Sequence, residues 1–145
     1  MTQYTVSSGQ TLSGTNLSTT YVPNVGFRGG NYIYDSAEVQ AGGTLLNAAD
    51  QMGASVVVDA GGLAANTSIT GGSLTVSTGG NITGTALGGF YYNPALPQFN
   101  NPYPTALEIY GSANNTTISG GNARIEAGGS ANDIIVTSPY VIASE

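Results

Sequence analysis

The side chains that could do chemistry in this chain are its carboxylates. The sequence contains no His and no Cys, and its only basic residues are two arginines. These absences exclude Ser-His-Asp and Cys-His nucleophiles, zinc sites built on those residues, and phosphate-binding Gly-x-x-x-x-Gly-Lys loops. The remaining catalytic option is a carboxylate pair, as in glycoside hydrolases. The available acids are Asp35, Glu38, Asp50, Asp59, Glu108, Glu126, Asp133 and Glu145.

The acids are scattered along alternating stretches rather than gathered in one motif. Most stand beside a Val or Ile, as Glu38 stands beside Val39 and Glu126 beside Ile125. Successive side chains of a strand point to opposite faces, so we expect an acid beside an inward residue to face solvent. The sequence therefore predicts no catalytic residue and no enzymatic activity.

One segment comes near a calcium-binding repeat. Gly128 to Ile135 approaches the nonapeptide Gly-Gly-x-Gly-x-Asp-x-U-x, but Ala131 replaces one of its glycines. No tandem copy follows, and such sites share ligands between adjacent repeats. We expect no metal site and no cofactor.

Charge excludes two classes of partner. The formal net charge is −6, and Arg28 and Arg124 are the only cations among the side chains. Nucleic-acid binding needs clusters of Lys and Arg, as does docking on anionic membranes. No run of about 18 apolar residues predicts membrane insertion. Residues 1–6 lack the basic and then apolar pattern of a signal peptide, which leaves an intracellular protein, export by another route or a recombinant fragment.

Aromatic residues gather in two segments, 20–35 and 89–105, which hold most of the Tyr and Phe. The second segment is also rich in Pro, which cannot donate to a strand ladder, so we expect both to be protruding loops. They either pack on the wall of the fold or form a binding surface, for which Tyr is well suited. The candidate ligand- or partner-binding residues are Tyr32, Tyr34, Tyr91, Tyr92 and Phe99.

The rest of the chain is repetitive, and this repeat must position the loops. Four stretches read x-Val/Ile-x-Ala/Thr-Gly-Gly, around Val39, Val58, Val76 and Ile125, and a degenerate copy lies around Ile109. Second halves begin at Asn66 and Asn115, with a looser copy at Asn132–Ile135. Alternating apolar and polar residues indicate half-buried strands, and Gly pairs supply the corners.

This pattern predicts an all-β fold, a right-handed parallel β-helix, or β-solenoid, in one domain over residues 1–145. The repeat-like parts are 4–17, 37–89 and 106–138. Val39, Val58 and Val76 should stack as an inward column that Ile109 and Ile125 continue, with neighbouring strands about 4.8 Å apart. The Asn residues either form an amide ladder or serve only as turn residues.

The stretch from Val58 to Gly72 resembles the AIDA-type repeats of bacterial autotransporter adhesin passengers. The resemblance covers roughly 37–89 and 106–138, with a weaker patch at 4–17. It implies a right-handed parallel β-helix, a bacterial surface or secreted location, and a role in adhesion or cell–cell association.

The leading functional prediction is a non-catalytic structural or adhesive module of a bacterial surface or extracellular assembly. A solenoid exposes unpaired backbone at both ends, and neither the segment Tyr4–Leu17 nor the segment Asn122–Val136 resembles a cap, so we expect end-to-end association into oligomers or filaments. Cell-surface glycans or other surface proteins are the further partners. The alternatives are a carbohydrate-binding module that uses the aromatic loops, and a segment of a phage tail fibre.

Overall fold

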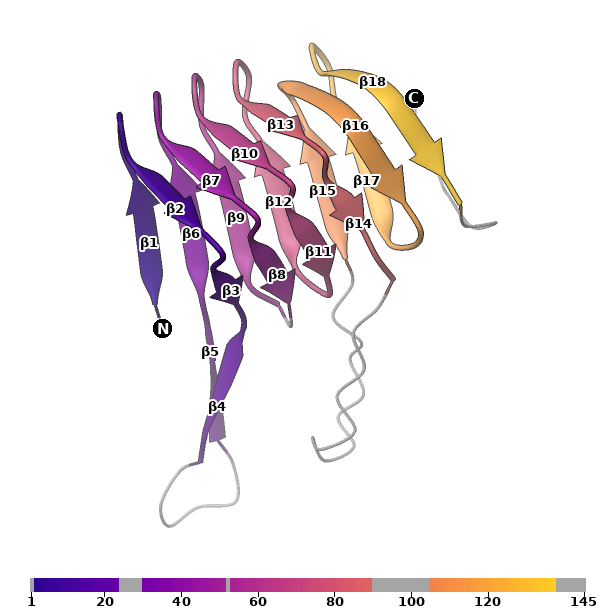
Figure 1. Ribbon diagram of the computed structural model, residues 1–145. Helices are drawn as coiled ribbons and strands as arrows, with labels where there is room; N and C mark the ends of the chain where they lie inside the picture. The colour runs from indigo at the N-terminus through magenta and orange to yellow at the C-terminus, as the bar shows by residue number, and fades with distance from the viewer. Residues whose placement is uncertain (1, 24–29, 52, 90–104, 138–145) are drawn as a thin grey trace.

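The chain winds into six coils, each contributing one strand to a six-stranded parallel sheet. The computed structural model describes residues 2–23, 30–51, 53–89 and 105–137. Each coil has three sides, which we call faces 1, 2 and 3, and the strands of one face lie in a row along the axis (Figure 1). The described residues contain no helix long and apolar enough to cross a membrane.

Face 1 is the six-stranded sheet, and every neighbouring pair in it is parallel. Its strands are β1 (Gln3–Val6), β6 (Ser36–Val39), β9 (Ser55–Val58), β12 (Ser73–Val76), β15 (Ala106–Ile109) and β17 (Asn122–Ile125).

Faces 2 and 3 form one bent sheet, because the last two coils each run through both faces as a single strand. Face 2 contains β2 (Thr11–Ser13), β7 (Thr44–Leu46), β10 (Leu63–Ala65) and β13 (Asn81–Thr83). Face 3 contains β3 (Asn16–Leu17), β8 (Ala49–Gln51), β11 (Ser68–Thr70) and β14 (Ala86–Leu87). The two long strands are β16 (Ser112–Ile118) and β18 (Ser130–Val136).

The predicted inward column is confirmed. Val39 pairs with Val58 and Val58 with Val76, in parallel register, and Ile109 and Ile125 continue the series. The column is buried from the first coil through Ile109, whereas Ile125 in the last coil is 51% exposed. The core is therefore a narrow stack of Val, Ile, Leu and Ala side chains, in which each coil covers the one before it.

The Gly pairs lie at the corner between faces 1 and 2, and their two glycines have different roles. The first adopts a left-handed conformation, as Gly61 does with φ of 78°. The second lies against the carbonyl oxygen of the coil before: a Cβ on Gly80 would stand 2.6 Å from Val58 O. Equivalent overlaps would occur at Gly43, Gly62 and Gly129. Gly111, which follows Tyr110 and is not part of a pair, would overlap Gly80 O of the coil before. The first glycine is thus needed for its left-handed backbone conformation, and the second because no Cβ fits beside the carbonyl oxygen.

The corner between faces 2 and 3 is a single left-handed residue in every coil. Asn47, Asn66, Asn115 and Asp133 have φ between 51° and 54°, and glycines occupy the position in the other two coils. Asn66 Nδ2 donates to Asn47 Oδ1 at 3.4 Å, but Gly14 and Gly84 occupy the corner in the coils on either side. The Asn residues therefore serve as left-handed turn residues and form one amide contact rather than a continuous ladder. The predicted repeat at Asn132 was displaced by one residue, because Asp133 rather than Asn132 takes the left-handed corner.

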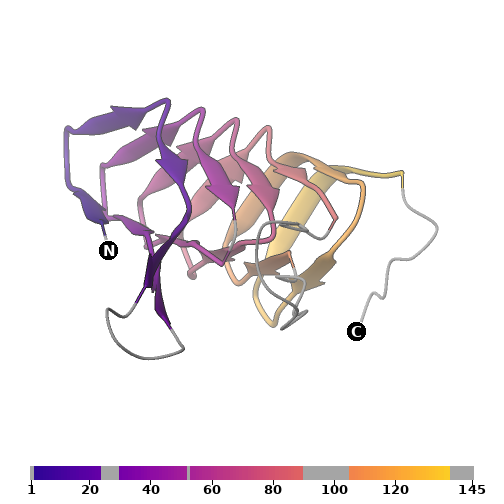
Figure 2. The same cartoon turned by 90° about the horizontal axis from the view of Figure 1, so that it is seen from below.

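Both aromatic segments leave the solenoid at the third corner, between faces 3 and 1. The first was predicted as a loop, which is wrong in part: β4 (Thr19–Pro23) and β5 (Gly30–Tyr34) form an antiparallel hairpin. The hairpin projects away from the coils (Figures 1 and 2). The second segment lies between β14 and β15, and its residues 90–104 are outside the described residues.

Candidate functional site

The structure describes two of the five candidate aromatic residues. Tyr34 ends β5 and is 42% exposed, and the backbone of Tyr32 lies opposite that of Tyr21 in the register of the hairpin. Tyr91, Tyr92 and Phe99 lie outside the described residues. Whether these five residues form one patch therefore remains a prediction.

Hydrogen bonds close the neck of each aromatic segment. Asp35 N–H donates to Ser18 O at 3.0 Å, and the Asp35 carboxylate accepts from Thr2 N–H at 2.8 Å. At the second neck, the buried Thr105 hydroxyl donates to Gly89 O and accepts from Gly71 N–H, both at 2.6 Å. The two necks are separated by three coils, roughly 14 Å at the strand spacing.

An acidic pair lies on the outer side of face 1. Glu38 and Asp59 come from neighbouring coils and line a depression of about 270 Å³ together with Tyr4 and Val57. Desolvation raises the pKa of Asp59, the charge and hydrogen bond of Glu38 raise it further, and the Ser77 hydrogen bond lowers it. Glu38 also accepts a hydrogen bond of 3.2 Å from Gln40.

This pair does not have the geometry of a glycoside hydrolase. Glycoside hydrolases keep their two carboxyl groups roughly 5–9.5 Å apart so that a sugar or a water can enter between them. Here the two carboxyl groups are hydrogen-bonded to each other, and Glu38 is exposed. Groups in hydrogen-bonding contact stand closer than the separation that a glycoside hydrolase uses.

Asp50 is the exception to the expected outward placement of the acids. In the register of face 3 it stands between Leu17 and Ile69, in an inward column, and it is 0% exposed. Its carboxyl group lies against Gly72, where a Cβ would overlap both oxygens. Neither oxygen has a hydrogen-bond partner of ordinary geometry. The prediction that the acids face solvent is therefore wrong for Asp50.

Burial raises the pKa of Asp50 from 3.8 to about 8, and the nearby Ser73 N–H lowers it. A lone ionised carboxylate in an apolar column is far more costly than a neutral one, so the folded protein keeps the proton at neutral pH. Among the described residues around it, Leu17, Ile69 and Gly72 supply no opposite charge.

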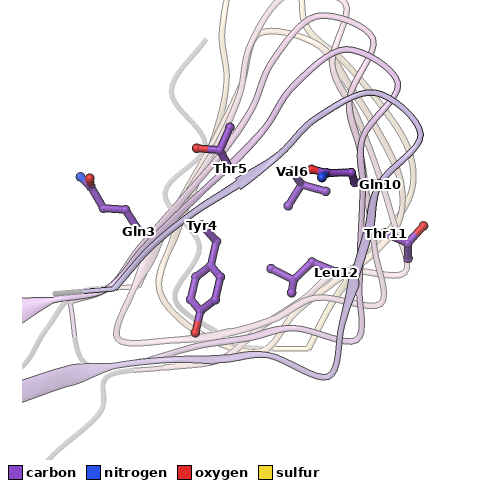
Figure 3. Close-up of a pocket in the computed structure, with 7 residues that line it drawn as sticks. All are labelled: Gln3, Tyr4, Thr5, Val6, Gln10, Thr11 and Leu12. Atoms are coloured by element: carbon purple, nitrogen blue, oxygen red, sulfur yellow. The ribbon is translucent and has the colours of Figure 1, made fainter.

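The N-terminal end of the solenoid has a concavity, and at one of its edges a side chain satisfies a backbone hydrogen-bond donor. A concavity of about 460 Å³ is lined by Tyr4, Val6, Gln10 and Leu12 among others (Figure 3). Gln10 Oε1 accepts from Ser7 N–H at 2.9 Å. In each later coil the N–H that follows the valine column donates instead to a carbonyl of the coil before it, as Gln40 N–H does to Val6 O. Gln10 thus supplies the acceptor that a preceding coil would have supplied.

The C-terminal end has no equivalent closure among the described residues. Ile125 and Val136 are 51% and 49% exposed, and both line a smaller apolar hollow of about 150 Å³. Val6 and Leu17, which head the same two inward columns at the other end, are only 3% and 0% exposed. The two ends therefore differ in how much apolar core they leave uncovered.

Among solved structures, the chain is similar to a hyper-glycosylated TibA55-350 fragment whose glycosylation is catalysed by TibC. The TM-score is 0.57 and the identity 26%, over 99% of this chain and 50% of the fragment. The chain therefore spans about half the length of that fragment. No family model and no curated protein matches the chain. The likeness supports the parallel β-helix and fits an AIDA/TibA-like passenger.

Sequence reasoning missed Asp50 and Gln10, although each left a signal. Aligning the second halves of the coils sets Asp50 opposite Leu17 and Ile69, where an acid is out of place. Aligning the first halves sets Gln10 where later coils have the second Gly of the pair. Both signals require the register of the coils and not only the local alternation.

Proposed function

We propose that this chain is a non-catalytic structural and adhesive module of a bacterial surface or extracellular assembly, and that it self-associates end to end. The observation that carries the proposal is the likeness to the TibA fragment over 99% of the chain. The AIDA-type pattern of the repeats points in the same direction. A rigid stack of coils suits this role because it holds its surface residues at fixed spacing without a catalytic cleft.

Self-association is supported by the uncovered apolar residues of the last coil. Unpaired strand edges with exposed apolar side chains are templates for another chain. Ile125 and Val136 lie on such edges, at the ends of columns that are buried elsewhere.

Adhesion can be tested with beads coated with the purified chain. We expect coated beads to clump, and we expect beads coated with the Val58→Asp variant to stay dispersed, because a charge at this fully buried position unfolds the coil. Coated beads that stay dispersed and bind neither one another nor a surface of immobilised bacterial cells would refute the proposal.

Recognition of carbohydrate is the second candidate. It is favoured by the placement of both aromatic segments at one corner and by the exposure of Tyr34. Binding of the chain to a glycan array, reduced by Tyr34→Ala and by Tyr32→Ala, is the expected result. Equal binding by the native chain and by both variants would show that Tyr32 and Tyr34 do not take part in glycan binding.

Absence of catalysis is tested separately. We expect no release of reducing ends from any polysaccharide, because the sequence has no His, Cys or Lys and because Glu38 and Asp59 are in direct contact. Turnover that disappears in Asp59→Asn or Glu38→Gln would show that the acidic pair is catalytic.

A further inference from the structure

The corner between faces 1 and 2 sets a condition on any coil that stacks on another. The second glycine of the pair exists because a Cβ there would overlap the carbonyl oxygen of the preceding coil, as at Gly62 with Val39 O and at Gly129 with Ile109 O. A coil that lacks this glycine cannot sit on a preceding coil in the same geometry.

The first coil lacks it. Thr11 pairs with Thr44, so Gln10 stands where Gly43 stands in the second coil. If another coil were placed before the first with the same spacing, its carbonyl oxygen would overlap the Gln10 Cβ. The Gln10 amide also occupies Ser7 N–H, the donor that such a coil would need. Gln10 therefore blocks the N-terminal end both sterically and by removing a hydrogen-bonding group.

Among the residues that the structure describes up to 137, the C-terminal end shows no such obstacle. In the preceding coils the last residue of each face 1 strand accepts from the next coil, as Ile109 O accepts from Glu126 N–H at 2.9 Å. Ile125 O is the corresponding group of the final coil, and β17 and β18 have no described strand on their outer sides.

We propose that a second copy of this chain binds the C-terminal end through its own C-terminal end, β17 and β18 facing β17 and β18, and that Gln10 prevents addition at the N-terminal end. This rests on the proposed end-to-end association and specifies which ends meet. A two-fold arrangement presents the same patch from both copies and closes after one step, whereas a head-to-tail contact would continue into a filament. Self-association of the native chain therefore stops at a pair.

Charge on the end strand is compatible with this contact. Arg124 and Glu126 form an ion pair of 3.4 Å beside the edge. In an antiparallel second copy, the Glu126 carboxylate can lie opposite the Arg124 guanidinium of the first copy, and the reverse. A strand whose charges all had the same sign could not make such a contact.

The test is the mass of the full chain in solution as a function of concentration, by mass photometry and sedimentation velocity. We expect a monomer–dimer equilibrium for the native chain. Ile125→Lys should shift it to monomer without changing the circular dichroism, because this side chain is half exposed. Thr5→Lys, at an exposed outward position of β1 at the other end of the solenoid, is the matched control and should still pair.

Two variants of Gln10 separate its two effects. Gln10→Gly removes the Cβ and should allow species larger than dimers, since head-to-tail stacking becomes possible. Gln10→Ala loses the hydrogen bond to Ser7 but keeps the Cβ, so it should remain a monomer–dimer system. Filaments of the native chain, or the same species for Gln10→Gly and Gln10→Ala, would overturn the block at Gln10.

The proposed adhesive function and this inference fail separately. A native chain that stays monomeric at millimolar concentration refutes the pairing of C-terminal ends, whereas clumping of coated beads reports adhesion by any surface. A trimer would also refute the two-fold contact and would favour the arrangement of a fibre.

Discussion

Asp50 should make the solenoid less stable as pH rises, and replacing it should remove this dependence. Below about pH 4 the carboxyl group is protonated in both the folded and the unfolded chain, and it imposes no ionisation cost. As pH rises towards the folded pKa of about 8, the unfolded chain ionises while the folded chain keeps its proton. The free energy of unfolding therefore falls between about pH 4 and pH 8 and is level above that.

The size of the effect follows from the pKa. Raising it from 3.8 to about 8 corresponds to a full cost of roughly 6 kcal/mol, at about 1.4 kcal/mol per tenfold change in proton affinity. About 4 kcal/mol of this is felt at pH 7, and about 2 kcal/mol at pH 5. Such a cost is a large share of the stability of an ordinary domain.

Two substitutions test the reasoning. Asp50→Asn keeps the shape and the unpaired polar group but cannot ionise, so we expect a gain of about 4 kcal/mol at pH 7 and almost none at pH 4. Asp50→Leu matches the neighbouring Leu17 in the column and should gain further from apolar burial at every pH.

The assay is urea unfolding between pH 4 and pH 8.5, followed by tyrosine fluorescence and circular dichroism. Glu108→Gln, an outward carboxylate on β15 of face 1, is the control and should leave in place the fall in stability that Asp50 causes. The reasoning is refuted if the native chain and Asp50→Asn have parallel stability profiles over this range.

The remaining predictions concern packing and hydrogen bonds. Gly62→Ala should lower the unfolding free energy by more than about 3 kcal/mol because its Cβ overlaps Val39 O, while Gly89→Ala, with open space around it, should change it by less than about 0.5 kcal/mol. Thermal denaturation of both variants checks this difference. Thr105→Val should cost about 1–3 kcal/mol because Gly71 N–H loses its buried acceptor. Thr85→Val should be neutral or stabilising, since the Thr85 hydroxyl is buried without a hydrogen-bond partner; equal losses for the two valine variants would contradict this assignment. Val58→Asp should abolish cooperative unfolding, as measured by circular dichroism.

The architecture could be predicted from sequence because its signals are local and repeated. Alternation around Val39, Val58 and Val76, followed each time by a Gly pair, fixes both the inward side of the strand and the place of the corner. Once one coil is recognised, stacking follows from the need to bury the inward side chains. The positions of both aromatic segments at one corner also follow from their places between recognisable repeats.

The register of the last coil, the burial of Asp50 and the hairpin were harder to predict from the sequence. The predicted register of the last coil was wrong by one residue, because Asn132 and Asp133 are both suited to a left-handed corner. Only the pairing of this coil with Asn114 and Asn115 shows which of the two takes it. Asp50 is preceded by small residues, so local alternation gave no reason to turn it inward. The hairpin was missed because the break in the repeat and the prolines of the second segment led to the prediction of loops in both segments, although residues 30–34 are rich in strand-forming side chains.

The third corner has a practical consequence for protein engineering. At Ser18–Asp35 and at Gly89–Thr105 the chain leaves the stack and returns through a narrow, hydrogen-bonded neck, while the coils on either side keep their register. Foreign peptides inserted at such a neck should leave the rest of the stack folded. Because successive coils are about 4.8 Å apart, two grafted peptides would be held at a separation chosen by the number of coils between them. The solenoid can thus serve as a scaffold that displays two epitopes at a fixed separation.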